Sequence, residues 1–292
     1  MTGILNILKP TGMTSHDVVS SVRKILNVKK VGHAGTLDPN AAGVIAVCIG
    51  KGTKLSDYLM NGDKEYVCEL ILGQSTDTQD SYGNIINSVA DVNVNLKDIT
   101  GALKDFEGEQ TQIPPMYSAV KLKGKKLYEY ARQDNIVERQ GRLITIKEIE
   151  LIKFDKNRVL MRVKCTKGTY MRTLCSDIGE KLGTYGHMGV LIRTEAKGLR
   201  IENSITLDRL KFLYDNDRLN ECILPVDEAC PLKKVTVNEK YYDRIIAGNG
   251  VYADTSGLNS IKFYIYCKNQ LIGIGKKSNT TDNSVKIEKL LM

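Results

Sequence analysis

Short apolar runs alternate along the chain with segments whose apolar residues follow helical spacing, a pattern typical of an α+β protein. Residues 44–49 are continuously apolar and predict a buried strand. Residues 64–72 are rich in strand-forming side chains and end at Gly73. Apolar positions from 18 to 26 predict a helix that Thr14 or Ser15 caps. Strands and helices thus alternate from the N-terminus onward.

The same reading extends to residue 224. It predicts strands at 4–8, 143–154, 158–165 and 186–194, and helices at 53–60, 96–106, about 172–182 and 207–214. The polar segment 74–84 is expected to be a mobile loop in which Asp77 and Asp80 are solvated. After residues 224–228, four short β-type runs separated by Gly and Asn predict a small β-barrel-like domain.

Composition points to a soluble protein with a polyanionic partner. The 292 residues carry a net charge of +8, and residues 229–292 hold ten Lys and Arg against five Asp and Glu. Lysines and arginines that neutralise phosphates gain affinity by counterion release. No long apolar stretch or signal segment is present, so we expect a cytoplasmic protein without a membrane span.

Cysteine and histidine usage argues against a metal site. The seven cysteines form no Cys-x-x-Cys pair, and an odd number of scattered thiols is typical of a reducing compartment. The three histidines have no zinc-ligand spacing with them. We therefore expect no metal.

Residues 31–43 form the candidate site. Three glycines, a proline and several alanines leave the backbone open to a partner, and Asp38 is the one acid among them. The buried strand that follows would anchor this loop on a rigid element. Two interpretations are open: Asp38 is catalytic, or Asp38 and Pro39 simply make a turn.

Residues 113–132 form a basic segment. Three tyrosines lie among the cations Lys121, Lys123, Lys125, Lys126 and Arg132. Charge for phosphates and aromatic faces for unstacked bases are what RNA binding needs. The alternative is a solvated hairpin and helix with an ordinary lysine face.

Other polar residues are ambiguous from the pattern alone. Lys9 is either a phosphate contact or a solvated turn lysine, and Tyr66 shares the core face of its strand with Cys68. Arg172 stands at a strand-to-helix junction, where a long cation reaches a cleft if an acid lies opposite. Leu191 is most simply a core residue.

Six motifs in order resemble one family. They are NILKP at 6–10 with Thr14 and Ser15, GTLDP at 35–39, KEY at 64–66, PMYSAVK at 115–121, KGTYMRTL at 167–174, and HM at 187–188 followed by Leu191 and RT at 193–194. Together they resemble the bacterial tRNA pseudouridine-55 synthases, which isomerise the T-loop uridine of tRNA.

The resemblance implies a fold and a domain plan. It implies a catalytic domain over residues 1–228, built on a mixed, mainly antiparallel sheet flanked by helices. An insertion at about 112–140 would close on the T-loop through the basic residues named above. Residues 229–292 would form a small β-rich domain similar to a PUA-type RNA-binding domain.

The resemblance also implies roles for individual residues. It makes Asp38 the catalytic carboxylate, Arg172 its ion-pair partner and Tyr66 the residue that stacks on the target base. The contacts to substrate that it implies are Lys9, His33, Tyr170 and Leu191. Ala34 and Ala42 stand where the family commonly has a hydroxyl residue, and we expect only local hydrogen bonding to change.

The implied chemistry is an isomerisation without redox change, so no cofactor is expected. The target base must be flipped out of a folded loop, and a carboxylate nucleophile attacks either the base or the sugar carbon. The expected partner is tRNA, bound at its T-loop and T-arm, and no obligate protein partner is expected. Two alternatives stay open: a tRNA-folding chaperone without chemistry, and a guide-RNA-dependent synthase of the related type. A glycosidase is disfavoured because no second acid lies in any matching motif.

Overall fold

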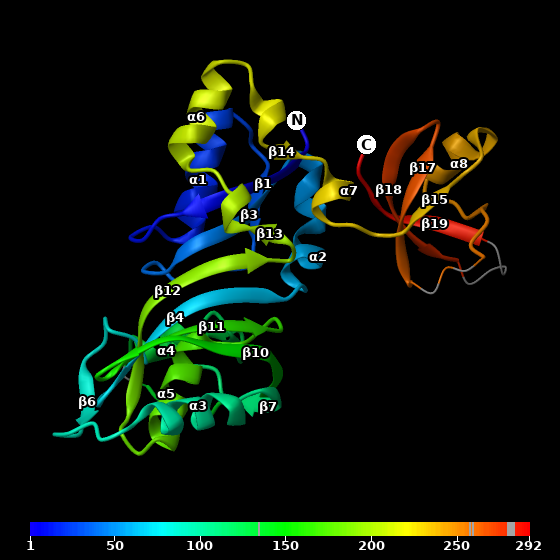
Figure 1. Cartoon of the computed structure of the whole chain (residues 1–292). Helices are drawn as coiled ribbons and strands as arrows, with labels where there is room; N and C mark the ends of the chain where they lie inside the picture. The colour runs from blue at the N-terminus through cyan, green and yellow to red at the C-terminus, as the bar shows by residue number, and fades with distance from the viewer. Residues whose placement is uncertain (134, 257, 259, 279–283) are drawn as a thin grey trace.

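The computed structural model describes residues 1–133, 135–256, 258, 260–278 and 284–292. Its larger part is built on a ten-stranded sheet in the order β14-β1-β3-β12-β4-β11-β10-β7, with β2 added to β3 and β13 to β12 (Figure 1). The strands are β1 (Gly3–Lys9), β2 (Val31–Ala34), β3 (Ala42–Ile49), β4 (Lys64–Leu72), β7 (Gly108–Gln112), β10 (Arg142–Asp155), β11 (Arg158–Cys165), β12 (Gly186–Ala196), β13 (Leu199–Arg200) and β14 (Ile223–Leu224).

The pairing is antiparallel except where β12 runs parallel to β3 at the centre. This parallel pair joins Ile192 to Ala42 and Arg193 to Gly43. The expected mixed, mainly antiparallel sheet is confirmed. Because β12 also pairs with β4, it connects the two halves of the sheet directly beside the Asp38 loop.

Two pairs of helices cover the two halves of the sheet (Figure 1). In the first half, α1 (Ser15–Leu26) and α6 (Leu207–Asp215) bury Val18, Val22 and Leu210 against β1 and β3. In the second half, α3 (Leu96–Asp105) and α5 (Met171–Lys181) enclose an apolar cluster with β4, β10, β11 and β12. Thr14 caps α1 in a capping box, as the sequence predicted.

Short elements connect these layers. They are the 3₁₀ helices η1 (Gly50–Leu55), η2 (Ile201–Asn203) and η3 (Leu219–Glu221), the helices α2 (Ser56–Met60), α4 (Leu127–Ala131) and α7 (Val226–Ala229), and the strands β5 (Gln74–Thr76), β6 (Ile85–Ser88), β8 (Lys121–Leu122) and β9 (Lys125–Lys126). The helix expected at 53–60 begins as 3₁₀ turns that contain two glycines, and only its second half is α-helical.

The C-terminal part forms a separate five-stranded sheet in the order β15-β17-β18-β19-β16 (Figure 1). Its elements are β15 (Lys234–Thr236), η4 (Glu239–Tyr241), α8 (Tyr242–Ile246), β16 (Val251–Tyr252), β17 (Lys262–Cys267), β18 (Gln270–Lys277) and β19 (Ser284–Leu290). The four predicted β-runs are confirmed. Strand β19 and the short α8 were not predicted, because α8 spans little more than one turn and β19 mixes charges with apolar residues.

The small sheet packs on the larger part at the 50–60 segment. The Lys54 ammonium donates to the Leu290 carbonyl at 2.7 Å, and that of Lys289 donates to the Lys54 carbonyl at 2.8 Å. The Tyr264 hydroxyl donates to the carbonyls of Val226 and Cys230. In the described part of the chain, no helix combines the length and apolar character needed to cross a membrane.

Candidate active site

The Asp38 loop, residues 35–41, connects β2 to β3 at the centre of the sheet. Gly35 has a φ of +92°, which lies in the left-handed region that favours glycine. At the end of the loop, a Cβ on Gly43 would lie 2.2 Å from the Arg193 carbonyl oxygen, so only glycine lets β12 approach this closely. The Leu37 side chain is buried in the apolar cluster of the second half. The loop is therefore fixed at both ends and in its middle.

Two polar residues from β1 and α1 hold the loop by its backbone. The Ser15 hydroxyl accepts from the Leu37 amide at 2.8 Å and lies 3.1 Å from the Leu37 carbonyl. The Lys9 ammonium donates to the carbonyls of Pro10, Met13 and Pro39 at 2.9, 2.6 and 3.0 Å. Burial lowers the pKa of Lys9 to about 8. The interpretation of Lys9 as a solvated turn lysine is wrong, because the residue is fully buried.

Asp38 and Arg172 form a two-point ion pair. The Nε of Arg172 lies 3.0 Å from Oδ2 of Asp38, and its Nη2 lies 3.3 Å from Oδ1. The Arg172 side chain is 6% exposed, whereas that of Asp38 is 40% exposed. The buried guanidinium thus fixes the orientation of the carboxylate, and the carboxylate remains accessible to a substrate.

Arg172 also joins two other segments to this pair. It donates from Nη2 to the Tyr117 carbonyl at 2.8 Å and from Nη1 to the Thr78 carbonyl at 3.3 Å. A second carboxylate, that of Asp80, has its Oδ2 3.9 Å from Nη1. The guanidinium therefore lies between two carboxylates and two carbonyls from three separate stretches of chain.

The expectation that Asp80 is solvated is wrong. Its side chain is only 15% exposed, and its Oδ1 accepts from the Thr78 hydroxyl and the Tyr82 amide. The segment is also held to the sheet, since the Ser81 amide donates to the Met188 carbonyl at 2.9 Å. Asp77, in contrast, is exposed as expected. The buried arginine opposite explains the difference, because it gives Asp80 a partner of opposite charge.

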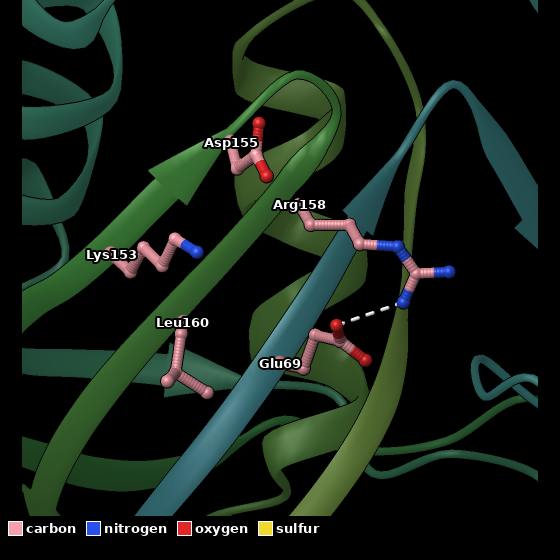
Figure 2. Close-up of a pocket in the computed structure, with 5 residues that line it drawn as sticks. All are labelled: Glu69, Lys153, Asp155, Arg158 and Leu160. Carbon is pink, nitrogen blue, oxygen red and sulfur yellow. Dashed lines mark hydrogen bonds and ion pairs between the residues drawn. The ribbon is translucent and has the colours of Figure 1, made fainter.

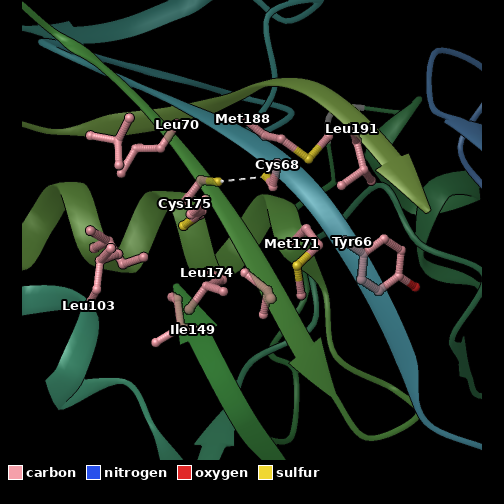
Figure 3. Packing of buried hydrophobic residues seen from close by; sticks show 14 of the residues in the cluster. Tyr66, Cys68, Leu70, Leu103, Ile149, Met171, Leu174, Cys175, Met188 and Leu191 are labelled. Atoms are coloured by element: carbon pink, nitrogen blue, oxygen red, sulfur yellow. Dashed lines mark hydrogen bonds between the residues drawn. The ribbon is translucent and has the colours of Figure 1, made fainter. Parts of the chain in front are cut away.

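Tyr66 lies at one end of the apolar cluster between β4 and α5 (Figure 3). Figure 3 shows its ring beside Met171 and Leu191, with the hydroxyl pointing away from the cluster. Burial raises the pKa of Tyr66 to about 12, against which the positive charge of Arg193 acts weakly. The phenol is therefore neutral near pH 7, and the residue is packed into the core as the sequence indicated.

The other residues named as substrate contacts lie on elements around the loop. His33 lies on β2, and burial lowers its pKa, so its imidazole is neutral. Leu191 is 7% exposed on β12, opposite Cys68 of β4. Tyr170 is the N-cap residue of α5 and is half-buried. The structure thus brings β2, β12 and the start of α5 together beside Asp38.

The basic segment forms a hairpin, β8–β9, followed by α4. Lys121, Lys123 and Lys125 are exposed. The cations of Lys126 and Arg132 lie 5.3 and 5.2 Å from the centre of the Tyr128 ring. The hairpin and helix are as expected, but this tyrosine already carries two cation–π contacts in place of an open face. Residue 134, inside the predicted insertion, lies outside the described residues.

A shallow hollow lies elsewhere, at the turn between β10 and β11 (Figure 2). It is lined by Glu69, Lys153, Asp155, Arg158 and Leu160, and Arg158 is paired with Glu69 at 2.8 Å. Glu69 directly follows Cys68 on β4, and successive side chains of a strand point to opposite faces. Glu69 therefore faces the side opposite to Tyr66 and Cys68. The hollow is therefore separate from the Asp38 site. Across the described chain, no three His, Cys, Asp or Glu side chains are grouped to hold a metal ion.

Sequence reasoning left two buried polar residues beside the site without a role. Gln112 accepts from the Tyr170 amide at 2.8 Å and donates to its carbonyl at 3.1 Å, which fixes the start of the helix that carries Arg172. Arg193, 1% exposed, donates to carbonyls on both sides of the loop. Arg193 had a signal, since it shares a strand face with Leu191, whereas Gln112 had none.

Solved structures share this fold over nearly the whole chain. The chain superposes on a Cbf5-Nop10-Gar1 complex with a TM-score of 0.76 at 30% identity, covering 99% of this chain and 85% of the other. An H/ACA RNP bound to a substrate RNA containing 2'-deoxyuridine gives a TM-score of 0.74 at 27% identity, with the same coverage. The fold is that of a pseudouridylate synthase.

Family models and curated relatives narrow this class. The N-terminal domain of the TruB family pseudouridylate synthases matches residues 23–171, and the tRNA pseudouridylate synthase B C-terminal domain matches residues 172–230. Proteins called tRNA pseudouridine synthase B are 45% identical in Alkaliphilus oremlandii and 42% identical in Clostridioides difficile. Both alignments cover 100% of this chain, together with 99% of the Alkaliphilus oremlandii protein and 100% of the Clostridioides difficile protein. The chain belongs to the TruB family.

Proposed function

We propose that this protein isomerises a uridine of tRNA to pseudouridine, at position 55 of the T-loop, with Asp38 as the catalytic carboxylate. The observation that carries the proposal is the ion pair at the Asp38 loop: the carboxylate is 40% exposed while the guanidinium that orients it is buried. Relatives that match the full chain and are named for this activity on tRNA support it.

The reaction moves the uracil from one attachment to another. The C1′–N1 glycosidic bond breaks, a C1′–C5 bond forms, the C5 proton leaves and N1 gains a proton. Asp38 serves as the nucleophile, and both attack on the base and attack on the sugar carbon balance these atoms. Arg172 aligns the carboxylate through its two-point contact, so that the nucleophile has a fixed orientation before the substrate arrives.

The remaining residues receive and hold the flipped nucleotide. Extrusion of the target base costs a few kcal/mol. Tyr66 offers a ring for stacking, Leu191 a pocket wall, and His33 and Tyr170 lie at the rim. Tyr66 is a stacking residue first, because its raised pKa means that it must lose its own proton before it can accept one from C5.

We further propose a division of labour along the chain. Residues 1–228 carry the chemistry, the insertion at 112–140 contacts the T-loop through Lys121, Lys123, Lys125, Lys126 and Arg132, and residues 229–292 act as a PUA-like RNA-binding domain. Lys9 affects the substrate indirectly, because it positions the backbone of the Asp38 loop through the Pro39 carbonyl. The seven free cysteines, of which six are buried and Cys222 is half-buried, fit a reducing cytoplasm.

The test is incubation of unmodified tRNA transcript with the wild-type protein and with Asp38→Ala, without other proteins. Pseudouridine is mapped by chemical labelling and primer extension, and tRNA binding is measured in parallel. We expect one T-loop uridine to be converted by the wild type, with the variant binding tRNA but inert. Binding by both proteins without conversion would favour a tRNA chaperone or a guide-RNA-dependent synthase.

The second candidate function is a guide-RNA-dependent synthase. It rests on the similarity of this chain to the H/ACA structures. It predicts that the wild type alone converts no uridine in the transcript. Conversion without a guide RNA or partner protein therefore separates the two candidates in the same assay.

A further inference from the structure

Among the described residues, Arg193 has the largest fully buried side chain, and the proposed chemistry does not use it. It is 1% exposed. On β12 it is opposite Tyr66 of β4 on one side and opposite Gly43 of β3 on the other. It therefore stands where the strand of the stacking tyrosine and the strand that follows the Asp38 loop are joined.

The guanidinium is held by three main-chain oxygens, and the Tyr66 side chain also accepts a hydrogen bond from it. Its Nε donates to the Val44 carbonyl at 2.7 Å, its Nη2 to that of Gly35 at 3.1 Å and its Nη1 to that of Thr36 at 3.4 Å. Gly35 and Thr36 precede Asp38, and Val44 follows the loop. One planar group thus fixes the separation of the two ends of the loop.

Arg193 has no carboxylate partner. Within the part of the chain that the structure describes, no Asp or Glu oxygen lies within 4.0 Å of its guanidinium. A buried charge without a counter-ion is costly, so its retention calls for a role besides packing. Hydrogen bonds to three carbonyls engage three of the five N–H donors but leave the positive charge in place.

That charge acts on the groups around it. It lowers the pKa of Lys9, His33 and Lys64, alongside the larger effect of burial. It also opposes the rise in the pKa of Tyr66. Other charged or titratable groups that face these residues are Asp38, Asp17, His16, Asp63, Lys167 and Cys165.

We infer that Arg193 is a positioning residue for the isomerisation, which sets the height of the Asp38 loop over the sheet so that the carboxylate faces a base stacked on Tyr66. The inference rests on the proposed function. Misplacement of a reacting group by about 1 Å can cost about 100-fold in rate. Loss of the guanidinium should therefore slow the chemical step while leaving the exposed tRNA-binding surface intact.

The experiment compares Arg193→Met and Arg193→Lys with wild type under single turnover, with saturating enzyme over tRNA. Under these conditions the rate constant reports folded molecules, so partial unfolding does not mimic a slower step. We expect Arg193→Met to lower the rate constant by about 100-fold and Arg193→Lys by about 10-fold, with Kd for tRNA within about threefold of wild type. The lysine recovers part of the rate because it keeps the charge and a donor nitrogen, although it lacks the planar fork of the guanidinium.

Leu103→Ala is the matched control. Leu103 is buried on α3 in the same domain, at the end of the apolar cluster away from Tyr66 (Figure 3). It should lower thermal stability without changing the rate constant. Equal rate constants in wild type and both Arg193 variants would overturn the inference. So would a loss that Leu103→Ala reproduces at matched stability. Failure of the proposed function is distinct, because wild type itself would then convert no uridine.

If Arg193→Met does not fold, Arg193→Lys decides alone. A rate constant below wild type at unchanged Kd supports the positioning role, and a wild-type rate constant contradicts it.

Discussion

The Asp38 loop and the basic hairpin β8–β9 are both short connections, but they are built on opposite principles. The loop is held by Ser15, Lys9 and Arg172 from three elements, through contacts that are mostly buried. The hairpin exposes Lys121, Lys123 and Lys125. Catalysis needs a fixed geometry before the substrate arrives, whereas RNA backbone contacts tolerate movement. Substitutions around the Asp38 loop should therefore affect the rate constant, and those in the hairpin β8–β9 should affect the affinity for tRNA.

The largest effect is expected at Arg172. Arg172→Met removes the two-point contact to Asp38 and should lower the single-turnover rate constant by about 1,000-fold, because preorganised charge at the reacting group is lost. Binding of tRNA should change little. Arg162→Met is the control, since Arg162 forms an exposed pair with Glu150 and lies away from the loop. A rate within a few-fold of wild type in Arg172→Met would remove the ion pair from the mechanism.

The second effect concerns Asp80. Asp80→Asn replaces the oxygen that faces Arg172 with an amide while keeping an acceptor for Thr78 and Tyr82. We expect a rate constant lowered by about 10-fold and an unchanged Kd, because the guanidinium loses one of its two anionic neighbours.

Asp77→Asn tests the specificity of that result. Asp77 is on the same loop but exposed, and it bonds Asn84. If both variants slow the reaction equally, loop stability and not the charge near Arg172 is responsible.

The sequence carried most of the fold and part of this site. Alternation and caps identified α1 and six of the ten strands of the large sheet, because local periodicity reports which face is buried. The shorter strands β2, β7, β13 and β14 were not predicted. The motifs brought Asp38, Arg172 and Tyr66 together. Asp80 was misjudged as solvated, because its burial depends on an arginine more than 90 residues away in sequence, a distance that no local pattern spans. Gln112 was missed for the same reason.

A third, smaller effect is a pH dependence from Lys9. Its pKa is lowered from 10.5 to about 8, and the neutral amine has two hydrogens for three carbonyls. As pH rises through about 8, one of these three hydrogen bonds is lost. Because the bond to Pro39 holds the Asp38 loop, we expect the rate constant to fall by about fivefold, equivalent to about 1 kcal/mol. Folding responds in the opposite sense: the unfolded chain binds more protons between about pH 8 and 10.5, so stability gains from this group as pH rises there.

Lys64 provides the control for this assignment, because burial lowers its pKa to about 8 as well. Its ammonium donates to the carbonyls of Met60 and Gly62, outside the Asp38 loop. The fall in rate should persist in Lys64→Met and be absent in Lys9→Met, which is slow at every pH. A fall that disappears in Lys64→Met instead would assign the titration to Lys64.

The smallest effect is expected in the hairpin, where Lys123→Ala and Lys125→Ala each remove one exposed cation. Each change should weaken tRNA binding by about two- to threefold near physiological salt and reduce the slope of log K against log salt by about one, with the rate constant at saturation unchanged. Lys153→Ala, on the far end of β10 beside the hollow of Figure 2, is the matched control and should alter neither quantity. A lowered rate constant at saturation in either hairpin variant would mean that the hairpin shapes the catalytic geometry as well as the affinity. The hairpin would then not be an adaptable RNA contact alone. The Arg172 contact to the Tyr117 carbonyl is the connection through which such an effect would pass.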